Sequence, residues 1–241
     1  MIAGAGKIRP SSDHISTLNE KHLHAALKAW YAQDGDRLEV RVEGYLVDVV
    51  RGDLLIEIQT RGFGAIRRKL AKLAAAHPVR LVHAIPQEKW IIRQSNAGVV
   101  LGRRRSPKHG SFEDVFVELV GIPNLIENAN FSLELLLIRE EEVRRHDSTR
   151  RGWRRKGWVT HERRLLDVVS RRVFETPKDL AALIPAALPE PFTTAGLASA
   201  LGKPRWLAQK MAYCLRAMGA LDVAGKRGNA VLYARPSRTA P

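Results

Sequence analysis

The chain has 241 residues, of which 45% are hydrophobic, and this length can hold one large domain or two modest domains. Lys and Arg outnumber Asp and Glu by 40 to 25, which gives a formal net charge of +15 at pH 7. The lone Cys214 excludes an internal disulfide framework and a cysteine-based zinc site. No apolar stretch is long enough to span a membrane and no secretory signal is visible, so we expect a cytoplasmic protein without a membrane partner.

Two neighbouring runs of β-forming residues bring acidic side chains together. One run carries Asp48, a tight turn follows at residues 51–53, and the next run carries Glu57 and Gln59. Because side chains alternate between the two faces of a strand, Glu57 and Gln59 point to one face, and a hairpin can place Asp48 beside them. Converging carboxylates are costly unless they bind something, and hard divalent cations prefer oxygen ligands. We exclude Asp53 from this site because Asp is favoured in turns for local reasons.

The predicted elements follow a recognisable order. A helix with Glu20 is followed by a strand, the strands with Asp48 and Glu57, a helix from about Gly64 to Ala75, and two strands at residues 80–85 and 89–93. This order and the Asp48…Glu57-Ile-Gln motif resemble the PD-(D/E)xK nuclease superfamily over residues 14–100. Restriction endonucleases and archaeal Holliday-junction resolvases belong to that superfamily. The resemblance implies an α/β (α+β) fold with a restriction-endonuclease-like mixed sheet flanked by helices.

The resemblance also implies a function, that of a metal-dependent DNA endonuclease, a hydrolase of phosphodiester bonds. Asp48, Glu57 and the Ile58 carbonyl would coordinate Mg²⁺ or Mn²⁺, and Glu20 would hold a second metal or orient a metal-bound water. No small-molecule cofactor is expected.

Gln59 stands where the superfamily usually has Lys, which would help hold the attacking water and offset charge on the phosphate. Arg61 has the same parity as Gln59 and can supply that charge if the strand extends so far.

Each candidate also has a purely structural interpretation. Glu20 can complete a capping box with Thr17. Asp48 can be an edge-strand charge that prevents aggregation, and Glu57 can be a salt-bridged surface residue. His83 shares parity with its apolar neighbours, so we expect a hydrogen-bonded core histidine there.

The middle segment, residues 101–175, is strongly basic. A Gly- and Pro-containing basic loop at residues 101–110 suggests a domain boundary. We predict a helix over 111–119, a strand over 130–138 and a helix over 161–174. Between them, residues 150–158 interleave five cations with two tryptophans, which suits either contact with phosphates and exposed bases or a solvated loop with core tryptophans. The candidate DNA contacts here are Arg150, Arg151, Arg154, Arg155 and Lys156.

The C-terminal segment has a helix-turn-helix pattern. Thr193 or Thr194 can cap a short helix that Gly202 ends, and a second helix begins near Pro204. An upstream helix over 177–184 and a hairpin with a basic, glycine-rich tip at 224–229 complete the pattern. Residues 176–236 resemble the winged-helix DNA-binding family.

That resemblance implies that the second helix enters the major groove and that the hairpin contacts phosphates. The candidate DNA contacts here are Lys203, Arg205, Gln209, Lys210, Lys226 and Arg227. We expect Trp206 and Tyr213 to be packing residues. Alternatively, the winged helix serves protein contacts or dimerisation.

The sequence therefore predicts a nuclease-like domain at residues 1–100, a basic middle segment at 101–175 and a winged helix at 176–241. The predicted function is cleavage of duplex or branched DNA, and double-strand cutting would favour a homodimer. One alternative is a non-enzymatic DNA-binding regulator with an inactive nuclease-like domain, which Gln59 favours. A second is an RNA-processing or ribosome-associated protein that uses the tryptophan-rich basic segment.

Overall fold

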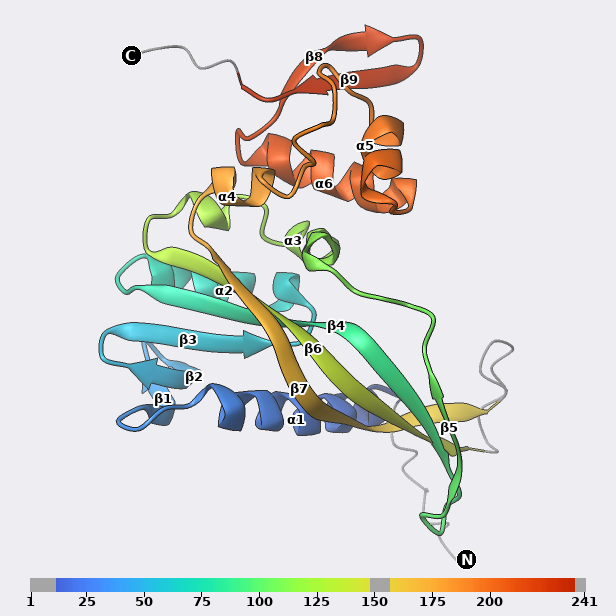
Figure 1. The fold of residues 1–241 in the computed structure, drawn as a ribbon. Helices are drawn as coiled ribbons and strands as arrows, with labels where there is room; N and C mark the ends of the chain where they lie inside the picture. The colour runs from blue at the N-terminus through green and yellow to red at the C-terminus, as the bar shows by residue number, and fades with distance from the viewer. Residues whose placement is uncertain (1–11, 148–156, 237–241) are drawn as a thin grey trace, which may run out of the picture.

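A seven-stranded mixed sheet runs through the chain from Arg37 to Phe174 in the computed structural model (Figure 1). The structure describes residues 12–147 and 157–236, with side chains from residue 22 onward. The elements in chain order are α1 (Ser12–Tyr31), β1 (Arg37–Val42), β2 (Tyr45–Arg51), β3 (Leu54–Gln59), α2 (Phe63–Ala74), β4 (Val79–Gln94), β5 (Val100–Arg105), the short 3₁₀ helix η1 (Phe112–Val115), α3 (Phe116–Leu119), η2 (Leu125–Glu127), β6 (Phe131–His146), β7 (Trp158–Phe174), α4 (Pro177–Ala181), α5 (Thr194–Leu201), α6 (Arg205–Ala217), β8 (Asp222–Arg227) and β9 (Ala230–Ala234).

The first three strands form an antiparallel meander, and α2 then carries the chain to β4, which is parallel to β3. Gly44 and Gly52 turn the two hairpins at positive φ angles of 82° and 56°, which glycine adopts without steric cost. The predicted order of helix, three strands, helix and strand is thus present. The mixed α+β architecture with a large sheet flanked by helices is confirmed.

Helices cover both faces of the sheet. On one face, Leu23 and Leu27 of α1 pack with Ile56, Ile58 and other buried residues of the sheet. On the other face, α2 and α3 pack over a second cluster that also contains the C-terminal helices (Figure 1). Burial of each large apolar side chain contributes about 2 kcal/mol, so these two layers supply most of the driving force for the fold.

The sheet continues across the boundary expected near residue 100. The two separate strands predicted at 80–85 and 89–93 are wrong, because β4 is one long strand with an irregularity between Pro86 and Glu88. That irregularity accommodates a proline, which has no N–H for the ladder. Part of the predicted basic loop at 101–110 is also wrong, since β5 occupies Val100–Arg105 and pairs with β4.

The helix predicted over 161–174 is wrong as well. These residues belong to β7, a 17-residue strand antiparallel to β6, which itself extends well past the predicted end at residue 138. The leucines and valines of this region fit helical spacing, but β6 offers a long edge whose backbone groups need partners. On β7, Arg163 donates to the fully buried carboxylate of Glu140 at 2.6 Å, a pairing that strand geometry makes possible.

The C-terminal segment forms three short helices and a two-stranded antiparallel hairpin. Thr193 accepts a hydrogen bond from the Gly196 N–H at 3.1 Å and so caps α5, and Gly202 ends that helix at a φ of 61°. The lone Cys214 lies buried in α6. The buried side of α6 packs against α3, so these helices share a hydrophobic core with the sheet.

Candidate functional site

A polar cluster lies where β2 and β3 separate. Their antiparallel pairing joins Val49 to Ile56 and stops there, so Asp48 and Glu57 lie just beyond the last pair. At this opening, Asp48 Oδ2 accepts a hydrogen bond from the Ile58 N–H at 2.9 Å. The backbone donor takes the place of a strand partner and fixes the Asp48 carboxylate at the opening.

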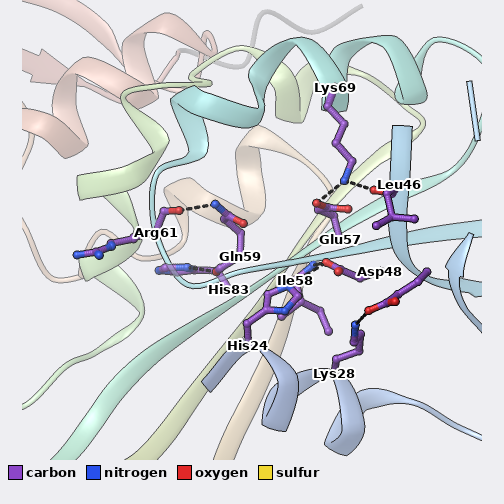
Figure 2. A network of polar contacts seen from close by, with 11 residues as sticks. His24, Lys28, Leu46, Asp48, Glu57, Ile58, Gln59, Arg61, Lys69 and His83 are labelled. Atoms are coloured by element: carbon purple, nitrogen blue, oxygen red, sulfur yellow. Dashed lines mark hydrogen bonds and ion pairs between the residues drawn. The ribbon is translucent and has the colours of Figure 1, made fainter. Parts of the chain in front are cut away.

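His24 reaches the same carboxylate from α1. Its Nε2 donates to Asp48 Oδ2 at 3.2 Å (Figure 2). Burial works to raise the pKa of Asp48, but the hydrogen bonds from His24 and Ile58 outweigh it, so that pKa lies below its usual value. The bond to Asp48 in turn raises the pKa of His24, against the opposing effect of burial. Asp48 is therefore held as an anion.

Lys69 approaches from the opposite side of the sheet, on α2. Its Nζ donates to Glu57 Oε1 at 2.5 Å and to the Leu46 carbonyl at 2.5 Å (Figure 2). The Glu57 side chain is 9% exposed, and its Oε2 is buried without a hydrogen-bond partner among the side chains and backbone that the structure describes. Burial and the Asp48 charge raise the pKa of Glu57 to about 7, although Lys69 opposes the rise. An unpartnered buried carboxylate oxygen is costly, and the raised pKa of Glu57 reflects that cost.

Gln59 and Arg61 lie at the end of β3 and in the turn that follows it. Gln59 Nε2 donates to the Arg61 carbonyl at 2.6 Å, within the turn that leads to α2. The strand ends at Gln59, so the condition under which Arg61 would reach the site is not met. Figure 2 shows the Arg61 side chain directed away from Asp48 and Glu57.

Lys69 fills the position next to Glu57 instead, and sequence reasoning missed it. The signal was present, because Lys69 lies three residues after Ile66 and four before Leu73, on the face of α2 that packs toward the sheet. The sequence analysis also did not predict His24. This residue follows the buried Leu23 on α1, whereas the site residue predicted on that helix was Glu20.

The other N-terminal candidates are placed as follows. The helix α1 begins at Ser12, five residues before Thr17, so the capping box of Thr17 and Glu20 is wrong. The Glu20 side chain lies outside the described side chains. His83 is a buried core histidine, as expected: its Nδ1 donates to the Gln59 carbonyl at 2.8 Å, and burial lowers its pKa.

The C-terminal candidates lie on an exposed surface. Arg205, Gln209, Lys226 and Arg227 are exposed and Lys210 is half-buried. By contrast, Lys203 Nζ forms an ion pair with Asp114 at 3.2 Å.

The prediction that Trp206 and Tyr213 are packing residues is wrong, because they are 51% and 55% exposed. The buried stripe of α6 consists of Leu207, Met211, Cys214 and their neighbours, and both aromatic residues lie on the opposite side.

The structure does not describe most of the basic residues between β6 and β7. Arg150, Arg151, Arg154, Arg155 and Lys156 lie outside the described residues, and so does most of the tryptophan-rich segment.

Two carboxylates can serve as metal ligands at the opening between β2 and β3. Within residues 22–147 and 157–236, no group of three or more His, Cys, Asp or Glu side chains is arranged to hold a metal ion. Asp48 provides an anionic carboxylate, and Glu57 provides a second one above about pH 7. The Glu57 Oε2 atom, which has no hydrogen-bond partner among the described residues, is of the oxygen type that hard cations take. In the same described residues, no helix has the length and apolar character needed to cross a membrane.

Residues 21–175 match the family described as Domain of unknown function (DUF8091). The chain belongs to this family. An uncharacterized protein of Treponema pallidum (strain Nichols) is 33% identical over 185 residues, which cover 76% of this chain and 73% of that protein. No solved structure matches the chain. The DUF8091 region contains Asp48, Glu57 and Lys69, whereas the helices and hairpin after residue 175 lie outside it.

Proposed function

We propose that the protein is a metal-dependent deoxyribonuclease that hydrolyses phosphodiester bonds in DNA. The observation that carries this proposal is the cluster of Asp48, Glu57 and Lys69 at the opening between β2 and β3, where one Glu57 oxygen has no partner within the described part of the chain. Two carboxylates lie beside a lysine on a core with the element order helix, three strands, helix and strand. This arrangement resembles the site of PD-(D/E)xK nucleases. We take the sheet to be restriction-endonuclease-like on that basis.

The donor set supports Mg²⁺ or Mn²⁺ as the cofactor. Asp48, Glu57 and the Ile58 carbonyl would hold the ion, since hard cations take oxygen ligands. When bound, such an ion lowers the pKa of a water and neutralises charge on the phosphate.

The protein's own groups have separate tasks around that ion. His24 and the Ile58 N–H keep Asp48 ionised and oriented. Lys69 is free to exchange its bond to Glu57 for one to a phosphate oxygen or to the attacking water, and so offset charge in the transition state. The lysine that the motif lacks at Gln59 is thereby supplied from α2.

We further propose that residues 176–236 form a winged helix that places DNA. Three helices and a hairpin occur in the order of that family, and four candidate contacts on α6 and the hairpin are exposed. Exposed cations bind phosphates through counterion release, without contributing to the chemistry.

Labelled duplex, single-stranded and branched DNA incubated with Mg²⁺ or Mn²⁺ tests the proposal. Wild-type protein is expected to cleave at least one substrate, and Glu57→Ala is expected to abolish cleavage while retaining DNA binding. Asp53→Ala is the matched control, because Asp53 is an exposed carboxylate in the β2–β3 turn. Equal cleavage by wild type and Glu57→Ala would refute the assigned site.

A non-enzymatic DNA-binding protein is the second candidate function. It is favoured by the absence of a third metal-binding side chain among the described residues and by Gln59 in place of lysine. Tight DNA binding by wild type with no cleavage of any substrate in either metal would select it.

A further inference from the structure

We infer that the outward face of α6 binds unpaired bases, so that the protein selects DNA in which single-stranded segments adjoin duplex. This inference rests on the proposed function for the identity of the nucleic acid. The face consists of Arg205, Trp206, Gln209, Tyr213 and Arg216, all of which are exposed.

The two aromatic residues form a platform along the helix. Trp206 and Tyr213 are seven residues apart, close to two full turns, so both rings lie on the same side of α6. Their separation along the axis is about 10 Å, which is the rise of about three nucleotides in a stacked strand. Single exposed aromatics are common on protein surfaces, but two aligned rings between cations are typical of single-strand binding.

The charges around the platform favour a polyanion. The helix α6 contains Arg205, Lys210 and Arg216 and no acidic residue. Its first turn has no side-chain cap, and Pro204 occupies the N-cap position. The Leu207 N–H donates to the Pro204 carbonyl at 3.0 Å, so the N–H groups of Arg205 and Trp206 are the ones at this end that can face an anion. An open pocket lies beside the platform, between α6 and the hairpin, and is lined in part by Arg205, Gln209 and Asn229. A neutral protein partner would leave these cations unmatched, which favours nucleic acid.

Aromatic rings distinguish unpaired bases from duplex. In a duplex the faces of the bases are covered by stacking and only their edges are accessible in the grooves. A ring on the protein surface therefore gains affinity by stacking only where bases are unpaired. The arginines contact phosphates in either form. The combination is suited to a fork, flap or branch, where one strand leaves the duplex.

Fluorescence anisotropy in metal-free buffer at one salt concentration tests this inference without cleavage. The probes are a blunt labelled duplex and the same duplex ending in unpaired arms. Wild-type protein is expected to bind the forked probe about 10-fold more tightly or better, because one stacked base contributes about that factor. A Trp206→Ala/Tyr213→Ala double variant is expected to lose this preference while binding blunt duplex as wild type does.

Two further variants test whether the preference for the forked probe depends on the two aromatic rings of α6. Trp30→Ala is the matched control, since Trp30 is 43% exposed on α1 at a distance from α6, and it should keep the preference. Trp206→Phe/Tyr213→Phe retains the ring faces and should keep most of the preference, which separates stacking from loss of fold.

Several outcomes would overturn the inference. These are a wild-type protein without preference for the fork, an alanine double variant that keeps the preference, or tighter binding of the same arms made of RNA. The proposed nuclease function fails separately. Absence of cleavage with an intact fork preference refutes the nuclease alone, whereas cleavage without a fork preference refutes only the role of α6.

Discussion

At the opening between β2 and β3 the charged groups are buried and bonded to one another, whereas on α6 and the β8–β9 hairpin they are exposed. Glu57 and Lys69 have side chains that are 9% and 15% exposed, while Arg205, Lys226 and Arg227 are exposed. Charges in a dry site act strongly and change the pKa values of their neighbours, and charges in water act weakly and are screened by salt. In the proposed function, the first region supplies the chemistry and the second holds the polyanion.

Lys69→Ala is expected to give the largest effect, because it should change the cleavage rate without changing the binding of DNA. Loss of this cation should reduce the single-turnover cleavage rate by about 100-fold or more, because transition-state charge would lose a fixed partner. Duplex affinity in metal-free buffer should not change. Lys72→Ala is the matched control, since Lys72 lies one turn later on α2 and is exposed. An unchanged rate in Lys69→Ala would remove Lys69 from the mechanism.

The next effect concerns the free energy of unfolding, and it tests whether the ionised Glu57 carboxylate destabilises the folded protein. The pKa of Glu57 is raised from 4.5 to about 7, so the folded protein holds a proton there that the unfolded chain releases. The charged form therefore destabilises the fold: the penalty is absent below about pH 4.5, grows up to pH 7 and is complete above it. Glu57→Gln should accordingly be more stable than wild type by as much as about 3 kcal/mol near pH 8.

Denaturation curves at acidic and alkaline pH measure this difference. The advantage of Glu57→Gln should vanish toward about pH 4. Asp53→Asn, which changes an exposed carboxylate in the β2–β3 turn, is the control variant. A Glu57→Gln variant less stable than wild type at pH 8 would show that Lys69 neutralises Glu57 fully and that no unmet demand for a cation exists.

A smaller effect is expected at the exposed hairpin. Lys226→Ala/Arg227→Ala should weaken duplex binding about 10-fold at low salt and reduce the slope of log affinity against log salt by about 1 to 2. The cleavage rate at saturating DNA should stay the same, because neither residue is near Glu57. Lys108→Ala removes an exposed charge from the loop after β5 and serves as the control. An unchanged salt slope in the double variant would remove the hairpin from the interface.

The smallest effect is expected for Lys203→Ala. Lys203 is already paired with Asp114, so its loss should change DNA affinity less than about twofold and lower the free energy of unfolding by at most about 1 kcal/mol. Binding measured by anisotropy and urea denaturation would check both values. A large loss of affinity would mean that Lys203 leaves Asp114 to contact DNA.

Local patterns predicted a substantial part of the molecule. The alternation of side chains placed Glu57 and Gln59 on one strand face, and the tight turn at residues 51–53 marked the hairpin that brings Asp48 near them. Of the two threonines that could cap α5, Thr193 is the cap, and Gly202 ends the helix as predicted. These features depend on interactions between residues that are close together in the sequence. A short stretch of sequence is therefore enough to predict them.

Other features were decided only by the tertiary structure. Residues 158–174 became a strand because the long edge of β6 needed partners, although their leucines and valines also fit a helix. Lys69, rather than Arg61, reached Glu57 because the packing of α2 sets its rotation over the sheet. Trp206 and Tyr213 became exposed because α3 and α5 bury the other side of α6. In each case the outcome depends on groups far away in the chain, and local spacing contains no information about where those groups lie.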